Sequence, residues 1–171
     1  NAVQINLFGS VRCCRAILPH FKTQKYGKII QVSGGGATAP MPYISAYAAS
    51  KAAVVRFAES LAEETRGTGI DVNALAPGAL NTRMLNEVLE AGAEKVGAAY
   101  YARALKQKAE GGADPKIAAA LAVYLASSVS DGITRKLISA VWDRWETLHE
   151  HTADLNGDVY TLRRIIPEDR G

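Results

Sequence analysis

Tyr47 and Lys51 are the two side chains whose types and spacing best suit acid–base chemistry. They stand four residues apart in a segment that predicts a helix, so they share one face about one turn apart. A phenol with a pKa of ~10 exchanges protons poorly at neutral pH, but a neighbouring ammonium favours the phenolate and lowers that pKa. The pair therefore indicates proton exchange with a substrate hydroxyl or carbonyl. The alternative for this spacing alone is a packed tyrosine beside a lysine whose stem lies along the surface.

The elements that must position this pair alternate between helices and short strands. Hydrophobic spacing predicts helices over 3–21, 45–66 and 115–125, a broken helical region over 83–110, and strands over 28–33, 70–76 and 136–141. Within 45–66, the buried face includes Val54, Val55 and Leu61, whereas Arg56 and Glu59 fall elsewhere. This order predicts an α/β fold with parallel strands, right-handed crossovers and helices on both faces. Ligands of such sheets bind beyond the carboxyl ends of the strands.

Composition and charge narrow the class of protein. The chain has 171 residues, a net charge of +3 and 48% hydrophobic residues, which is typical of one soluble domain. Its basic residues are scattered, so we expect no nucleic-acid partner. No apolar run approaches the ~20 residues that cross a membrane, and no signal peptide is recognisable, so we expect no membrane contact. Cys13 and Cys14 are adjacent, which predicts neither a metal site nor a disulfide framework but free thiols in the cytoplasm.

Several short motifs stand in a fixed order around the Tyr–Lys pair. They are Asn6-Leu7-Phe8-Gly9, the strand that ends at Ser33, Tyr47-Ala48-Ala49-Ser50-Lys51-Ala52-Ala53, the run from Pro77-Gly78 to Thr82, and Gly132-Ile133-Thr134. In this combination the sequence resembles the short-chain dehydrogenase/reductase family over residues 1 to about 141. The resemblance implies that 1–141 form the C-terminal part of a doubly wound, Rossmann-like parallel sheet. Residues 142–171 are then a C-terminal extension.

The resemblance also implies a role for each matching residue. Tyr47 is the expected catalytic acid/base, Lys51 lowers its pKa and binds the nicotinamide ribose, and Asn6 distorts a helix and holds a water of the proton relay. The expected cofactor-binding residues are Tyr47, Lys51, Pro77, Gly78, Leu80 and Thr82. We therefore expect an oxidoreductase that transfers a hydride between NAD or NADP and a small carbonyl or alcohol substrate. The expected assembly is a homodimer or homotetramer.

The sequence departs from the family at one catalytic position. The family has a serine about thirteen residues before the tyrosine, where it hydrogen-bonds the reacting oxygen, and here that position is Gly34. Ser33 would point to the other face if strand geometry persists, although the glycines that follow permit a shift of the loop. Thr38 or a backbone N–H are alternative donors, and loss of activity is a third outcome. We take Ser33 as the fourth catalytic residue, beside Tyr47, Lys51 and Asn6.

Two other functions remain open on these residues. A nucleotide-binding protein without turnover is consistent with Gly34. An NAD-dependent nucleotide-sugar epimerase or dehydratase is consistent with a similar Tyr–Lys pair and tightly held NAD. The tail, with Trp142, Trp145, Tyr160 and Arg163-Arg164, packs on this subunit or a neighbour, or forms a substrate-side wall.

One part of the dinucleotide site is missing from the sequence. The family's cofactor fingerprint is a glycine-rich turn between the first strand and its helix, whereas Gly34-Gly35-Gly36 lies just before the helix of Tyr47. The residue that would choose between NAD and NADP is missing too. The chain begins at Asn1 with a helical pattern already under way. We therefore expect a truncated chain that holds roughly half of the dinucleotide site.

Overall fold

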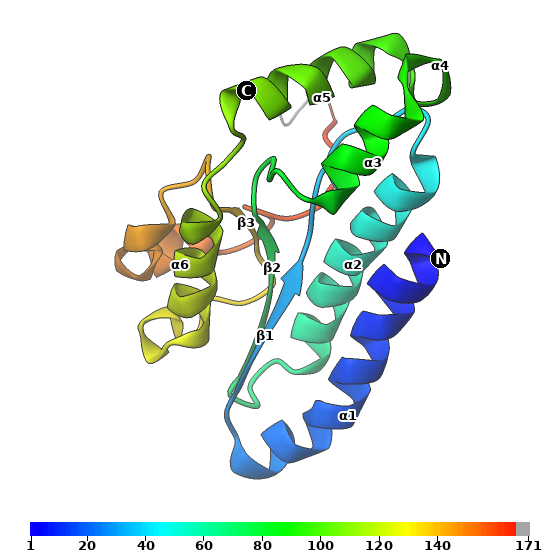
Figure 1. The fold of residues 1–171 in the computed structure, drawn as a ribbon. Coiled ribbons are helices and arrows are strands. Elements are labelled where there is room, and N and C mark those ends of the chain that lie inside the picture. The colour runs from blue at the N-terminus through cyan, green and yellow to red at the C-terminus, as the bar shows by residue number, and fades with distance from the viewer. Residues whose placement is uncertain (167–171) are drawn as a thin grey trace.

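The computed structural model describes residues 1–166 and shows a parallel sheet with helices on both faces (Figure 1). Its strands are β1 (Gly27–Val32), β2 (Ile70–Ala76) and β3 (Leu137–Ser139), in the order β1-β2-β3. Gly27 pairs with Ile70 and Val32 with Leu75, so β1 and β2 start together and β2 runs one residue further. Among the described residues, β1 pairs with β2 alone and its other edge has no strand partner. The predicted α/β class and parallel sheet are confirmed.

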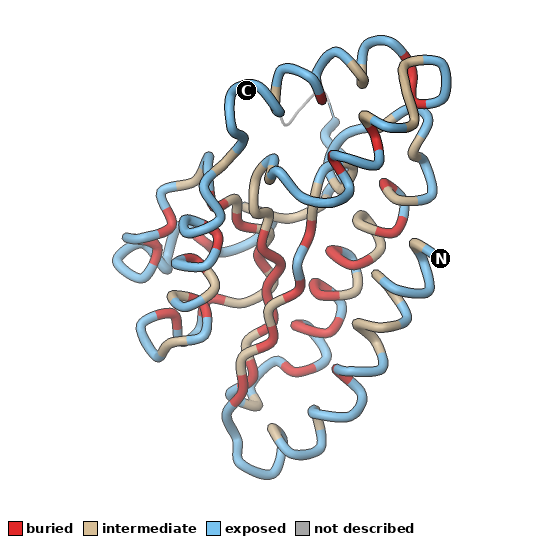
Figure 2. The backbone as a smooth tube through the Cα atoms, viewed as in Figure 1, coloured by how far each residue is buried: buried red, intermediate tan, exposed pale blue. Residues whose placement is uncertain are grey.

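The helices form two layers because each buries an apolar face against the sheet. The segment η1 (Gln4–Phe8), helix α1 (Gly9–Gln24) and helix α2 (Ser45–Glu64) lie on one side, and α6 (Pro115–Ala126) lies on the other. Val72 and Ala74 of β2 pack in the cluster of α2, whereas Leu75, the next residue, packs in the cluster of α6. This alternation is the two-residue period of a strand. Figure 2 shows the buried residues concentrated along the strands and the helix faces that meet them.

Three further helices stand at the carboxyl ends of the strands. They are α3 (Arg83–Ala91), α4 (Ala93–Val96) and α5 (Ala98–Glu110), and they share a small core of their own, made of Leu85, Val88, Val96 and Ala104. Helix α5 ends at Gly111, whose left-handed backbone lets its N–H bond the carbonyl of Gln107. Helix α6 begins as its sequence predicts, because the Asp114 side chain accepts a hydrogen bond from the Lys116 N–H. The short helices η2 (Ser128–Ser130), η3 (Trp145–Glu150) and η4 (Thr152–Leu155) complete the chain.

Several boundaries differ from the prediction by one to three residues, and two of these differences have a visible cause. The first helix continues past Phe21 to Gln24, with Pro19 inside it, and ends where Lys25 takes a left-handed backbone conformation. The third strand covers only 137–139 of the predicted 136–141. It starts one residue late because the Lys136 N–H bonds the Asn73 side chain instead of a strand neighbour.

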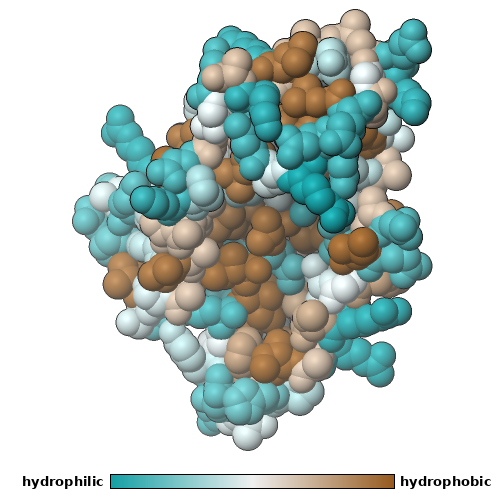
Figure 3. All heavy atoms as spheres, in the orientation of Figure 1, coloured by the Kyte–Doolittle hydropathy of each residue, from teal (hydrophilic) through white to brown (hydrophobic). Residues whose placement is uncertain are grey.

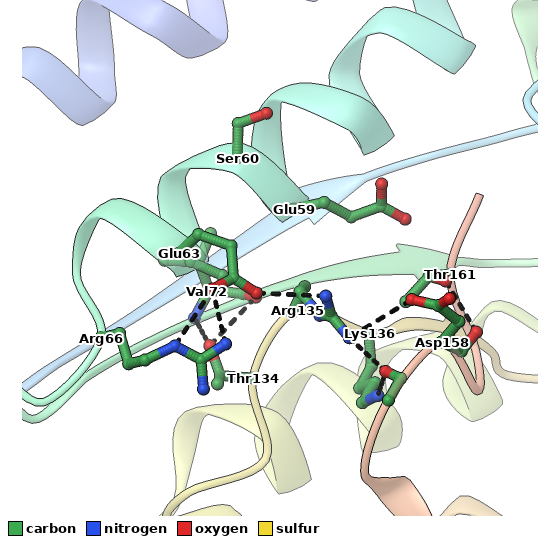
Figure 4. Close-up of polar contacts among 12 residues, drawn as sticks. Glu59, Ser60, Glu63, Arg66, Val72, Thr134, Arg135, Lys136, Asp158 and Thr161 are labelled. Atoms are coloured by element: carbon green, nitrogen blue, oxygen red, sulfur yellow. Dashed lines mark hydrogen bonds and ion pairs between the residues drawn. The ribbon is translucent and has the colours of Figure 1, made fainter. Parts of the chain in front are cut away.

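The tail covers the outer side of β3. The Leu137 N–H donates to the Tyr160 carbonyl at 2.7 Å, and the buried Lys136 Nζ donates to the Val159 carbonyl at 2.8 Å. Figure 4 shows Arg135 between Glu63 of α2 and Asp158 of the tail, with which it forms ion pairs. The tail therefore packs on its own chain. The domain boundary at 141 stays a prediction, and the last five residues of the extension lie outside the described part.

Glu59 is the residue whose predicted place is wrong. The helical spacing put it away from the buried face of α2, but it is buried at 5% exposure. Its Oε1 accepts a hydrogen bond from the Leu162 N–H at 2.6 Å, and its Oε2 lies 2.7 Å from Arg56 Nη1. The cause is the tail, which lies over this side of α2 and replaces solvent there.

Asn73 in the middle of β2 joins the last strand to the sheet. Its Nδ2 donates to the Ile133 carbonyl at 2.6 Å and its Oδ1 accepts from the Lys136 N–H at 3.0 Å, all within the core. We predict that Asn73→Leu, which orphans both backbone groups, lowers the free energy of unfolding by about 2–5 kcal/mol. Urea denaturation of the complete protein measures this value. Asn156→Leu, at an exposed asparagine, is the matched control, and equal effects of the two changes would contradict the prediction.

Candidate active site

A cleft of about 300 Å³ lies between the loops that follow β1 and β2 and the helices α3 and α5. It collects most of the residues that the sequence singles out, namely Ser33, Tyr47, Lys51, Pro77, Gly78, Leu80 and Thr82. Asn6 is outside its lining. In Figure 3 hydrophobic side chains gather on the hollowed face of the molecule below α3 and α5. The cleft is at the carboxyl ends of parallel strands, where ligands of such sheets bind.

Tyr47 and Lys51 lie on the same face of α2, and the Lys51 ammonium is bound to the end of β1. Lys51 Nζ donates to the Val32 carbonyl at 2.9 Å and lies 5.9 Å from the centre of the Tyr47 ring. Burial, with a smaller contribution from Tyr100, raises the pKa of Tyr47 above its ordinary value. Burial also lowers the pKa of the Lys51 ammonium. In this structure burial therefore dominates the pKa of Tyr47, and the lowering of that pKa by Lys51 stays a prediction.

Asn6 reaches the site through one intermediate residue. It lies in η1, a π-helical turn that interrupts the first helix where the resemblance implied a distortion. Its Nδ2 donates to Ser50 Oγ at 2.9 Å, and Ser50 Oγ in turn donates to the Tyr47 carbonyl at 2.7 Å. Ser50, which is buried, thus links Asn6 to the turn of α2 that carries Tyr47. Sequence reasoning quoted Ser50 within its motif but gave it no role. The water-holding role of Asn6 stays a prediction.

The position of the missing serine faces the phenol. A Cβ placed on Gly34 would lie 2.8 Å from Tyr47 Oη, so this residue, thirteen before the tyrosine, points at it. Ser33 continues the ladder, because its N–H donates to the Leu75 carbonyl at 2.8 Å. Its Oγ is buried and has no hydrogen-bond partner among residues 1–166. The catalytic role of Ser33 stays a prediction.

The loop after β2 is held by hydrogen bonds from α5 and from the residues that follow α5. Gln107 Nε2 donates to the Leu80 carbonyl at 3.0 Å and to Asn81 Oδ1 at 3.2 Å, and the Ala113 N–H donates to the Ala79 carbonyl at 2.9 Å. Sequence reasoning missed Gln107 because nothing in its local pattern distinguishes it from a surface residue of an amphipathic helix. Tyr100, which also lines the cleft from α5, was missed for the same reason.

The donor set of the cleft fits one end of a dinucleotide. An ammonium at Lys51, a phenol at Tyr47 and a hydroxyl at Thr82 line one wall, next to Gly34, Gly35 and Gly78, which offer no side chain to obstruct a ring. Sugar hydroxyls and an amide are the groups that such donors bind. No fingerprint turn that would hold a pyrophosphate occurs among residues 1–166.

In the described part of the chain, no group of three or more His, Cys, Asp and Glu side chains could hold a metal ion. Among residues 1–166, no helix has both the length and the apolar character needed to cross a membrane.

Comparisons with a family profile and with curated proteins agree on one family. The family profile described as "short chain dehydrogenase" matches residues 1–93. The D-beta-hydroxybutyrate dehydrogenase of Cupriavidus necator is 32% identical over 146 residues, which are 82% of this chain and 55% of that protein. The 3beta-hydroxysteroid dehydrogenase 1 of Eggerthella lenta is 43% identical over 81 residues, which are 47% of this chain and 31% of that protein.

Solved structures give the same result. A putative NAD(P)-dependent gluconate 5-dehydrogenase from Beutenbergia cavernae, with bound NADP, matches with a TM-score of 0.68 and 28% identity over 81% of this chain and 53% of that one. A gluconate 5-dehydrogenase from Burkholderia cenocepacia, in complex with NADP and tartrate, matches with a TM-score of 0.65 and 28% identity, over 78% of this chain and 51% of that one. The chain thus spans about half the length of these solved relatives.

Proposed function

The chain belongs to the short-chain dehydrogenase/reductase family, and on this premise we propose that the complete protein is an oxidoreductase acting on a small carbonyl or alcohol. In the proposed reaction a hydride passes between NAD(P) and the substrate carbon while Tyr47 exchanges a proton with the substrate oxygen. The observation that carries the proposal is the cleft itself. It brings Tyr47, Lys51 and the 77–82 loop to one wall at the carboxyl ends of β1 and β2.

The chain's own residues account for the proton transfer. Because burial raises its pKa, Tyr47 is protonated at neutral pH and can give its proton to a substrate carbonyl oxygen. Lys51, Thr82 and the 77–82 loop would hold the nicotinamide and its ribose. NAD(P), when bound, supplies or takes up the hydride. Asn6 and Ser50 hold the first turn of α2 in place behind Tyr47.

Transfer of deuterium tests this function directly. The complete protein is incubated with NADH and NADPH deuterated at the nicotinamide C4, each with a panel of small ketones, keto acids and cyclic ketones. We expect deuterium at the carbinol carbon of at least one product, detected by mass spectrometry. Tight binding of NAD(P) with no deuterium transfer, and no oxidation of the matching alcohols, would contradict the proposal.

A second candidate function is a nucleotide-binding protein without turnover. Gly34 favours it, because no side chain stands at the position where the family has its serine, next to Tyr47 Oη. The same experiment separates the two functions, since binding without transfer is the result that this candidate predicts.

The pH dependence of both directions follows from the raised pKa of Tyr47. In oxidation Tyr47 must accept a proton, so its active form is the phenolate, whose fraction grows about tenfold per pH unit below the pKa. We predict that initial rates of alcohol oxidation rise through pH 7–10, whereas carbonyl reduction, which needs the phenol, falls only as pH passes the Tyr47 pKa. Initial rates measured in both directions check this. An oxidation rate that is independent of pH over this range would refute it.

Assembly and location complete the proposal. We propose that the protein acts in the cytoplasm as a homodimer or homotetramer on a small-molecule substrate. The two cysteines without a disulfide support the location. Exposed apolar side chains on the first helical segment, at Ile5, Phe8 and Ile17, support contact with a second copy.

A further inference from the structure

The cleft leaves the substrate oxygen with one hydroxyl partner where the family has two. Gly34 faces Tyr47 Oη and carries no side chain. Ser33 is a poor replacement in this structure, because its Oγ is buried and its backbone is fixed in the ladder with β2. An oxygen that develops negative charge is stabilised by a second preorganised donor, so the reaction calls for another donor in the cleft.

Tyr100 is a phenol in the same cleft, on the wall formed by α5. It lines the cleft together with Tyr47 and Gly34. Burial raises the pKa of Tyr47, and an ionised Tyr100 would raise it further. Burial raises the pKa of Tyr100 as well, against a smaller opposing effect of Arg103. Tyr100 is therefore protonated at neutral pH and has an O–H to donate.

Two contacts hold Tyr100 in this place. Its ring packs on the small core shared by α3, α4 and α5, and the Arg103 guanidinium lies 5.8 Å from the ring centre. Three residues earlier, Gly97 lies directly against the ring of Tyr43, which precedes α2 and stands four residues before Tyr47. A side chain at Gly97 would collide with that ring. The start of α5 is thus packed against the segment that leads into α2, with Tyr100 and Tyr47 each about one turn further on.

We propose that Tyr100 is a catalytic residue, whose phenol O–H donates the second hydrogen bond to the substrate oxygen that exchanges a proton with Tyr47. This inference rests on the proposed function. Tyr100 forms and breaks no covalent bond and keeps its proton. Its contribution is to stabilise charge on the oxygen while the Tyr47 proton moves.

Three single variants of the complete protein test the proposal. Tyr100→Phe removes the hydroxyl and leaves the packed ring. Tyr101→Phe is the matched control, because Tyr101 is the neighbouring tyrosine of the same helix, packs on the same core and does not line the cleft. Ser33→Ala tests the competing donor. Each variant is compared with the wild type in kcat and KM over the ketone panel and by circular dichroism.

We expect Tyr100→Phe to lower kcat about tenfold to a hundredfold, as loss of a hydrogen bond to a charged group does. The KM for NAD(P) should stay unchanged. A fall in kcat with an unchanged KM for NAD(P) and an unchanged circular dichroism spectrum indicates loss of a hydrogen bond that is made in the transition state. A merely structural role would instead change the spectrum and the KM for NAD(P).

Three results would overturn the inference. The first is a Tyr100→Phe protein that behaves like Tyr101→Phe. The second is a loss of kcat in Ser33→Ala with none in Tyr100→Phe, which would make Ser33 the donor. Both leave the proposed oxidoreductase standing, because the wild type still turns over. The third is a wild type without turnover on the whole panel, which would remove the proposed function and this inference together.

Discussion

Tyr47→Phe is expected to lower turnover of the complete protein about a thousandfold, the scale of losing a positioned general acid–base group. The ring stays in its place on α2, and only the oxygen that would move the proton is lost. Stability should change little, because Tyr47 Oη makes no hydrogen bond within residues 1–166 and its removal orphans no partner. Steady-state kinetics on the best substrate of the panel and a urea denaturation curve measure the two effects.

The control for this variant is Tyr26→Phe. Tyr26 is outside the lining of the cleft. Its hydroxyl donates one long hydrogen bond, of 3.3 Å, to Asp131 Oδ1 at the other end of the sheet. The kcat and KM of the Tyr26→Phe protein should remain within about twofold of the wild type, as expected for a surface change away from the site. If Tyr47→Phe also retained wild-type turnover, the assignment of Tyr47 as acid/base would be wrong.

Gly34→Ser, which restores the family's residue, is expected to lower turnover about a hundredfold rather than to raise it. The new Cβ would lie 2.8 Å from Tyr47 Oη, closer than Cβ atoms approach their neighbours in real proteins. The hydroxyl that must meet the substrate has to move, and a displacement of about 1 Å in a catalytic group can cost 10²-fold in rate. The backbone of Gly34 is not in the left-handed region, so the effect comes from this contact and not from strain.

Gly9→Ser is the control for a serine added outside the cleft. Its Cβ would meet only the Gln4 carbonyl oxygen, at 3.9 Å, which is ordinary van der Waals contact. We expect the Gly9→Ser protein to keep activity within a few-fold of the wild type, because Gly9 does not line the cleft. Turnover by Gly34→Ser at or above the wild-type level would show that Tyr47 has room to adjust, and that the second hydroxyl was the missing element.

The fold was predictable because its signals are local. The segments around Ile29, Val72 and Ile138 are short and rich in β-branched residues, and each is separated from the next by at least one helical pattern, so the α/β class and the parallel order followed. Glu59 shows the limit of this reasoning. Its burial depends on Leu162, which lies 103 residues away in the sequence. Helical spacing reports which side of a helix is apolar, not what the rest of the chain places over the other side.

The candidate site also has residues that local patterns predict and residues that only the tertiary fold brings together. Tyr47 and Lys51 share one turn of a helix, so their common face followed from spacing, and the loop at Pro77 followed from its place at the end of a strand. Tyr100 and Gln107 come from a helix whose position over the cleft no local pattern states. The direction of the Tyr47 pKa shift could not be predicted from the sequence, because it depends on burial by the whole fold and on the hydrogen-bond partner of Lys51.

The two edges of the sheet differ in how readily they could pair with another molecule and cause aggregation. At β3 the tail occupies the Leu137 N–H, so that edge is partly covered against pairing with another strand. At β1 the edge has no strand partner among residues 1–166, and Val32 and Tyr26 are exposed near its two ends. An isolated fragment of these residues would therefore aggregate through β1, by edge-to-edge pairing, before it would aggregate through β3.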